Sequence, residues 1–317
     1  MRTIGTGAAV GESRMRRGGL AHATPQTAVH ATMQTRLRPG RADDAPEAGR
    51  IAYEAFRTIA TSHGFPPDFP SPEVAAGLLQ HLLVRADVHS VIAEHDGRVI
   101  GSNFLWEGDP VAGVGPITVD PAMQNAHTGR RLMQAVLQRA AERRSVGVRL
   151  VQAAYHNRSY ALYSKLGFVV REPLALMQGP VPEVARPDAT VRTAVVADLE
   201  KCDALSVRLV GYPRGTELRL AVAQGQARVA ERGGRITGYT TGIGFLGHAI
   251  GESNADVQAL VGAADAISGA GFLVPTRNAS LLGWCLAQGL RIVQPMTLMS
   301  TGEYRDPVGS FLPSVLY

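Results

Sequence analysis

The segment from Val114 to Phe168 constrains the fold of this chain most strongly. Its hydrophobic pattern predicts a series of elements, which are a strand at Gly113–Val119, a helix at Arg130–Arg144, a strand at Val148–Ala154 and a helix at Arg158–Leu166. The polar loop before the first helix has the form Gln-x-x-x-x-Gly, from Gln124 to Gly129. Free backbone N–H groups and the helix dipole both point at an anion placed at such a helix start. The segment therefore predicts a cradle for a pyrophosphate group.

The second helix of this segment ends on Leu162-Tyr163-Ser164-Lys165-Leu166-Gly167-Phe168, which places a phenol close to the helix end. Together with the Gln-x-x-x-x-Gly loop, this ending resembles the GNAT superfamily of acyl-CoA-dependent N-acyltransferases. The resemblance covers residues 34–178 well and residues 188–304 loosely. It implies acetyl-CoA as cofactor and direct attack, in a ternary complex, by a primary amine of a small molecule or peptide.

The resemblance also implies where the cofactor is held. The implied contacts come from the strand, the loop and the second helix, and they are Ile117, Thr118, Val119, Gln124, Asn125, Ala126, His127, Thr128, Gly129, Arg130, Asn157, Ser159, Tyr160 and Tyr163. Family members usually carry glycine where this chain has His127. This histidine either adopts a left-handed backbone conformation or closes the cradle and abolishes CoA binding. His156 occupies the position of the family's asparagine and Asn157 follows it, so either side chain is a candidate.

Acetyl transfer also needs an oxyanion donor, an acid for the leaving thiolate and a base for the amine. The resemblance implies that the Val119 N–H is the oxyanion donor, in a strand that splays from its neighbour. It implies Tyr163 as the acid, and the alternative role for Tyr163 is packing in the core. No base stands out, and the candidates are His63, Glu107, Asp109 and a water relay.

The acceptor is expected to enter over the first two helices, Ala45–Ala60 and Pro72–Arg85, and the loop at residues 62–70. This loop carries aromatic residues, prolines and one acid. Such a surface suits a small amine with apolar parts, although the aromatic residues could equally cover the core.

The chain contains a weak internal repeat. Residues 91–101 return as residues 228–238, and each copy reads as a strand, a tight turn and a strand. Two further pairs are Arg38 and Asp44 with Arg192 and Asp198, and residues 166–168 with residues 288–290. The spacing between the copies shrinks where the first copy has its phosphate loop, and the second copy has Glu252 and Asp256 there. We therefore expect a degenerate second copy without cofactor binding.

These patterns predict an α/β fold with a mixed sheet, in two tandem GNAT-like domains. Each domain is expected to be a mixed, mostly antiparallel sheet flanked by helices. Prolines near residues 178–189 mark the join. The expected parts are a disordered leader at 1–33, a catalytic domain at 34–178, a linker at 179–189, a degenerate domain at 190–304 and a tail at 305–317.

Composition argues against several other classes of protein. Residues 1–32 carry +3 of the net charge of +5, so the rest is close to neutral and nucleic-acid binding is disfavoured. No apolar run is long enough to span a bilayer, so no membrane association is expected. Cys202 and Cys285 form neither a disulfide framework nor a zinc site, and no metal is expected. Scarce lysine beside abundant arginine and alanine is typical of a high-GC bacterial sequence, and we expect a cytoplasmic location.

The sequence is therefore interpreted as an N-acetyltransferase with one catalytic copy. The alternative is a non-catalytic acyl-CoA-binding sensor or scaffold, which the histidine in the cradle would favour. The acceptor amine, the base, the choice between monomer and homodimer, and the origin of residues 1–33 stay open.

Overall fold

The computed structural model describes residues 35–124, 127–184 and 189–316, and every structural statement concerns these residues. The leader expected at 1–33 lies outside them. Residues from Gln34 onward form one compact unit. No helix in the described part is both long and apolar enough to cross a membrane.

The first half of the chain contains eleven named elements among the described residues. They are β1 (Arg36–Pro39), α1 (Ala45–Ser62), α2 (Pro72–Leu83), β2 (Val88–His95), β3 (Arg98–Trp106), β4 (Val111–Val114), β5 (Thr118–Val119), α3 (Thr128–Glu142), β6 (Gly147–Ala153), α4 (Asn157–Lys165) and β7 (Val169–Gln178). The predicted helices and strands lie within a few residues of these bounds. The strand expected at Gly113–Val119 is two strands, because Pro116 has no N–H to donate to a ladder.

The second half has the corresponding elements in a shorter form. They are β8 (Thr190–Thr193), α5 (Leu199–Val210), α6 (Gly215–Ala223), β9 (Arg228–Arg232), β10 (Arg235–Thr240), β11 (Ala249–Gly251), α7 (Asn254–Gly262), β12 (Phe272–Pro275), α8 (Ala279–Ala287), β13 (Arg291–Gly302) and β14 (Ser310–Leu312).

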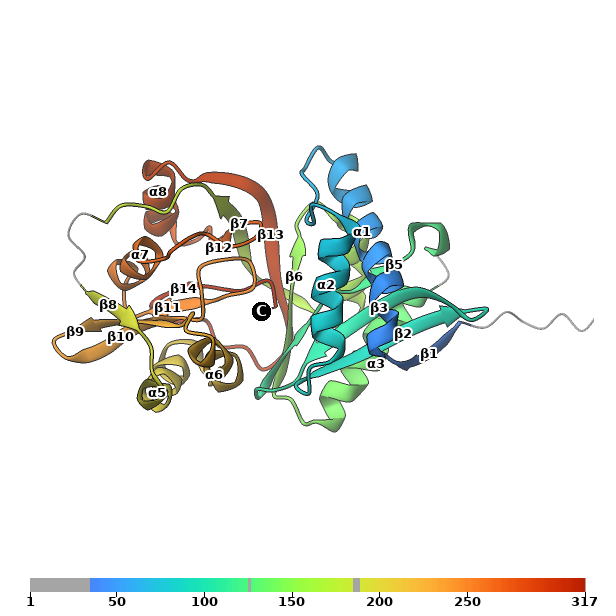
Figure 1. Ribbon diagram of the computed structural model, residues 1–317, viewed down its shortest axis with the longest axis horizontal. Helices are drawn as coiled ribbons and strands as arrows, with labels where there is room; N and C mark the ends of the chain where they lie inside the picture. Colours follow the sequence, from blue (N-terminus) through green and yellow to red (C-terminus); the bar gives the residue numbers. More distant parts are fainter. Residues whose placement is uncertain (1–34, 125–126, 185–188, 317) are drawn as a thin grey trace, which may run out of the picture. The chain divides into compact units, whose positions relative to one another are not determined.

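Two sheets organise these elements, and the larger one contains strands from both halves (Figure 1). Its order is β1-β2-β3-β4-β6-β13-β7-β12, with β5 also paired to β3, and the second sheet has the order β14-β11-β10-β9-β8. β13 pairs antiparallel with both β6 and β7, and β7 pairs with both β13 and β12. The last strand of each half therefore lies between two strands of the other half.

Helices cover both faces of the N-terminal part of the large sheet. The apolar sides of α1 and α2 pack on Val88, Ile92 and Phe104. The apolar side of α3 packs on the opposite face with residues of β3, β4 and β6, and Tyr163 of α4 joins this second core. The alternation of burial along β2 and β3 produces the two faces, since successive side chains point to opposite sides of a strand.

The internal repeat is visible in side-chain detail. Arg38 binds Asp44 at 2.6 Å and Glu94 at 2.7 Å, and Arg192 binds Asp198 and Glu231 at the same two distances. The side chains of the two aspartates do not cap the α-helices that follow them. Each carboxylate accepts an arginine and a backbone N–H of a short 3-10 turn instead.

Candidate active site

The helix α3 begins directly after a residue in the left-handed conformation. His127 has φ 59° and ψ 6°, and its carbonyl accepts the N–H of Arg131 at 3.1 Å. The N–H groups of Thr128, Gly129 and Arg130 precede that bond and have no carbonyl to reach within the helix. The histidine at 127 thus keeps the left-handed backbone that glycine adopts readily.

The surroundings of this helix start fit an anion. The hydroxyl of Thr128 is buried and has no hydrogen-bond partner among the described residues. A Cβ built on Gly129 would lie in ordinary van der Waals contact with Leu162 at 3.6 Å and Val119 at 3.8 Å. Free N–H groups, an unpaired buried hydroxyl and the helix dipole together suit a phosphate oxygen. Asn125 and Ala126, also expected here, lie outside the described residues.

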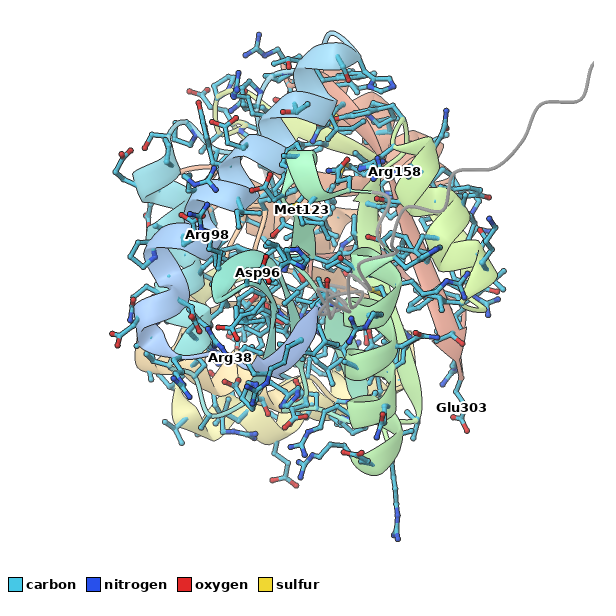
Figure 2. The ribbon with its side chains drawn as sticks, turned by 90° about the vertical axis from the view of Figure 1, so that its right-hand side faces the viewer. Arg38, Asp96, Arg98, Met123, Arg158 and Glu303 are labelled. Atoms are coloured by element: carbon cyan, nitrogen blue, oxygen red, sulfur yellow. The ribbon has the colours of Figure 1, made fainter. Side chains whose placement is uncertain are left out.

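Gln124 connects this loop to the neighbouring elements. Its side-chain Nε2 donates to the Val119 carbonyl at 3.3 Å, and its Oε1 accepts from Arg158 NH1 at 2.8 Å. Arg158 and Met123 appear on one face of the molecule in Figure 2. Arg158 was not among the cofactor contacts expected from the sequence, although a cation in the first turn of α4 could have indicated a contact with an anion. Its guanidinium lies beside the loop that leads to α3.

β5 separates from β6 and presents a free backbone edge. Parallel pairing of β4 with β6 ends at Gly113↔Arg149, and β5 pairs with β3 alone. Asp120 donates its N–H to the Ile100 carbonyl at 2.9 Å. Since hydrogen-bonded and non-hydrogen-bonded pairs alternate in an antiparallel ladder, the Val119 N–H points away from β3. It therefore faces the gap between β5 and β6, which is the splay that the sequence predicted.

The neighbouring contact residues take different positions. Ile117 joins the core beneath α3, and the buried Thr118 hydroxyl lies 3.2 Å from the hydroxyl of Ser102. Arg130 is half-buried in the first turn of α3.

Tyr163 lies on the inner side of α4 and is 6% exposed. Its ring packs against Phe168 at a centroid distance of 6.1 Å. Burial raises the pKa of the phenol to about 12, and a hydrogen bond with Ser159 partly opposes this shift. The phenol therefore stays protonated at neutral pH and is part of the core at the same time.

The first turn of α4 is capped by the side chain of His156. His156 Nδ1 accepts the Ser159 N–H at 3.3 Å, and Asn278 caps α8 in the same way through the Leu281 N–H at 3.2 Å. Burial lowers the pKa of His156, which favours the neutral ring that can accept this bond. Asn157 and Tyr160 are exposed beside it and remain candidates for cofactor contact.

Two of the three base candidates, Glu107 and Asp109, lie away from the gap. Glu107 accepts two hydrogen bonds from Arg139, at 2.6 and 2.7 Å, and Asp109 accepts the Thr216 N–H at 3.1 Å. Glu107 follows β3 six residues after Gly101, the partner of Val119, which places it about 20 Å along the strand. His63 is exposed, and its Nδ1 lies near the Ile59 carbonyl at 2.9 Å.

Another carboxylate, which was not among the bases expected from the sequence, lies near the end of β6. Asp68, in the loop between α1 and α2, accepts from Gln294 Nε2 at 3.2 Å, and Tyr155 donates to Gln294 Oε1 at 3.0 Å. Tyr155 follows the end of β6 by two residues, beyond the last position at which β6 pairs with β4. Burial raises the pKa of Asp68. Gln294 belongs to β13, so the second half of the chain completes this cluster.

Aromatic side chains cover the same cluster. The ring of Tyr155 stacks on Phe65 at 4.3 Å and on His63 at 5.3 Å between centroids. An amine entering over the loop at residues 62–70 would therefore meet apolar ring faces and one carboxylate, as the sequence suggested for this loop.

The corresponding place in the second half is filled by the chain itself. The Glu252 N–H donates to the Thr237 carbonyl at 2.9 Å, which repeats the bond of Asp120, but α7 starts almost at once. Asp256, fully buried, accepts the N–H and the hydroxyl of Ser253 at this helix start. β14 pairs with β11 on the edge that is free in β5. Within the described residues, no three potential metal ligands gather anywhere.

Comparisons with known proteins agree with this geometry. The sequence model of the acetyltransferase (GNAT) family matches residues 53–168. A candidate acetyltransferase from Pyrococcus horikoshii has a similar structure, with a TM-score of 0.68, 16% identity and coverage of 90% of this chain and 96% of that one. A GCN5-related N-acetyltransferase from Sphaerobacter thermophilus has a TM-score of 0.56, 16% identity and coverage of 87% and 98%. At this identity the two structures show the fold. No curated protein matches the sequence.

Proposed function

We propose that the protein is an N-acetyltransferase acting on a primary amine of a small molecule or peptide, because residues 53–168 match the sequence model of the acetyltransferase (GNAT) family. Acetyl-CoA, the cofactor of this family, supplies the acetyl group as a thioester. The observation that carries the proposal is the Val119 N–H facing the gap between β5 and β6, next to the open start of α3.

Different residues around the gap bind different parts of acetyl-CoA. The N–H groups of Thr128, Gly129 and Arg130 and the Thr128 hydroxyl hold the pyrophosphate, with Arg158 beside them. The free edge of β5 pairs with the amide groups of the pantetheine arm. Asn157, Ser159 and Tyr160, in the first turns of α4, line the same side.

The reaction balances with the groups present. The amine nitrogen forms a bond with the thioester carbon while the carbon–sulfur bond breaks. The Val119 N–H donates to the carbonyl oxygen as charge develops on it. Tyr163 gives its proton to the departing sulfur, and Asp68 accepts the proton of the amine, directly or through one water. Desolvation brings the pKa of Asp68 closer to neutral pH, which suits a base.

We further propose that residues 34–178 form the catalytic part and residues 190–304 a degenerate copy joined by residues 179–189. The buried carboxylate of Asp256 and the pairing of β14 support the loss of cofactor binding in that copy. The tail at residues 305–317 would then occupy, through β14, the edge of β11 that a cofactor would otherwise use.

Turnover with a panel of primary amines tests the proposal, with release of the CoA thiol as readout. Amine-dependent thiol release is expected, with formation of the N-acetyl product. Tight binding of acetyl-CoA without turnover of any amine would instead support the non-catalytic sensor.

A further inference from the structure

A cavity of about 500 Å³ lies away from the gap, where the two halves of the chain meet. Its walls come from α2, the end of β3, α6 and the loops at residues 240–247 and 264–269. Trp106, at its wall, is five residues along β3 from Gly101, or about 17 Å, so the cavity is separate from the proposed acetyl-transfer site. The volume is in the range that holds a small molecule.

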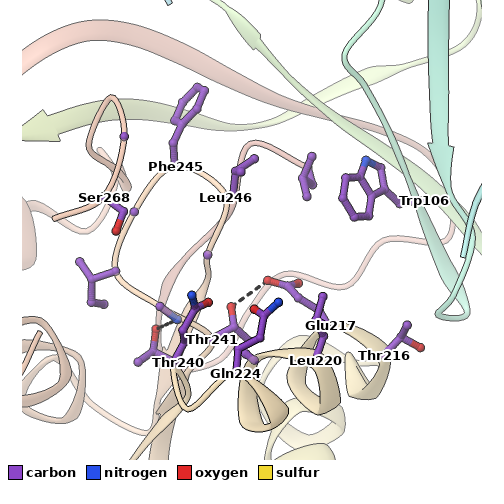
Figure 3. Close-up of a pocket in the computed structure, with 18 of the residues that line it drawn as sticks. Trp106, Thr216, Glu217, Leu220, Gln224, Thr240, Thr241, Phe245, Leu246 and Ser268 are labelled. Atoms are coloured by element: carbon purple, nitrogen blue, oxygen red, sulfur yellow. Dashed lines mark hydrogen bonds between the residues drawn. The ribbon is translucent and has the colours of Figure 1, made fainter. Parts of the chain in front are cut away.

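Most of the surface of the cavity is apolar, and the side formed by α6 carries a carboxylate. Trp106 faces α6 across the cavity, and Phe245 and Leu246 lie on the loop beside it (Figure 3). Glu217 and Leu220 project from α6 on the opposite side. The cavity therefore offers an aromatic and aliphatic surface next to a carboxylate.

The arginines that line the cavity are neutralised by their own partners. Arg85 binds Asp87 at 2.6 and 2.9 Å, and Arg228 binds Asp265 at 2.7 Å at the rim. Neither pair leaves a positive charge for an anionic ligand.

Asp109 and Glu217 differ from these pairs in how their negative charges are compensated. Glu217 accepts from Arg214 at 2.6 Å and from Thr241 at 2.8 Å, and lies 3.0 Å from His248 Nδ1. Asp109 accepts the Thr216 N–H, and no arginine or lysine of the described chain pairs with it. Of these two carboxylates, only Glu217 is paired with an arginine in the described part of the chain, and the wall therefore keeps a negative charge.

Glu217 is held in its anionic form by the donors around it. Burial alone would raise the pKa of Glu217, but Arg214, His248 and the Thr241 hydroxyl outweigh it and lower the pKa to about 2. An anionic ligand would be repelled here, and a purely apolar ligand would remove water from Asp109 without replacing it. A cation satisfies the carboxylate.

The geometry points to a binding site for a small organic ammonium ion. Its charged nitrogen lies against Asp109 and Glu217, and its apolar part lies against Trp106 and Leu246. Because Asp109 and Trp106 come from the first half and Glu217 from the second, the occupant stabilises the contact between the halves.

The sequence contains two tryptophans, so the variant Trp284→Phe makes Trp106 the only fluorophore of its kind. This variant is titrated with 2-phenylethylamine, 2-phenylethanol and 3-phenylpropionate while the Trp106 emission is recorded. We expect a saturable change in emission with the amine. The alcohol and the carboxylate should bind at least about tenfold more weakly than the amine. An amine bound only at the acetyl-transfer site leaves this emission unchanged.

Two further substitutions in the same background test the role of charge. Asp109→Asn keeps an oxygen for the Thr216 N–H and should weaken amine binding about tenfold. Asp43→Asn is the matched control, since Asp43 is an exposed carboxylate that does not line the cavity, and it should bind the amine like its parent. Unfolding midpoints confirm that both variants fold. Absence of a saturable change, equal binding of the alcohol, or unchanged amine binding in Asp109→Asn would overturn the proposal.

Discussion

Removing the hydroxyl of Tyr163 separates its catalytic role from its packing role. In Tyr163→Phe the ring keeps its contact with Phe168 at 6.1 Å and loses its hydrogen bond with Ser159. One such bond contributes about 1 kcal/mol to the free energy of unfolding, so the variant should stay folded. Loss of a general acid lowers kcat by about 100- to 10,000-fold, while the affinity for acetyl-CoA stays nearly unchanged.

The raised pKa adds a second, independent signature. A phenol with a folded-state pKa of about 12 and an ordinary value near 10 contributes stability that is complete below pH 10. That stability is lost as the pH rises from about 10 to about 12, and amounts to about 3 kcal/mol. Tyr163→Phe lacks this loss, so its free energy of unfolding should decline less than that of the wild type over this range.

Thiol release under saturating acetyl-CoA and amine measures kcat, and calorimetry measures cofactor affinity. Tyr304→Phe is the control, because Tyr304 is a partly buried phenol with a raised pKa in the other half of the chain. Its kcat should equal that of the wild type. A Tyr163→Phe enzyme with wild-type kcat would remove Tyr163 as the acid and leave it a core residue.

Three further perturbations test other parts of the account. Asp68→Asn should lower kcat at least about 100-fold. The activity of the wild type should fall as the pH drops through the raised pKa of Asp68. The pH–rate profile of the variant should lack this fall. Arg158→Ala, which frees Gln124, should weaken acetyl-CoA binding about tenfold by calorimetry, and unchanged affinity would exclude a phosphate role. Residues 34–184 expressed alone should show no cooperative thermal unfolding, because β7 then loses both of its strand partners; a sharp transition by circular dichroism would show that the half folds independently.

Much of the first half was predictable because its signals are local. Periodicity located α1 to α4 within a few residues, and Gly97 and Gly234 have the positive φ expected of their hairpin turns. The splay of β5 follows from Pro116, which cannot donate to a ladder. His127 has the left-handed backbone of the first of its two alternatives, and its effect on CoA binding stays a prediction.

The remaining features depend on contacts between distant parts of the chain. Asp68 became a candidate base only through Gln294, which is 226 residues away. The position of β7 and β13 among strands of the opposite half cannot be predicted from a local sequence pattern, because the two paired strands lie more than 100 residues apart. The pairing of β14 with β11 was equally hidden, because the tail carries only a short apolar stretch.

Calorimetric titration of acetyl-CoA into the full chain tests the central claim most directly. The account predicts one site per chain with micromolar affinity, held at the start of α3 and lost when the proposed phosphate contacts are disrupted. Absence of binding would show that His127 closes the cradle, and two sites would contradict the assignment of Asp256 and β14 as the groups that fill the second copy.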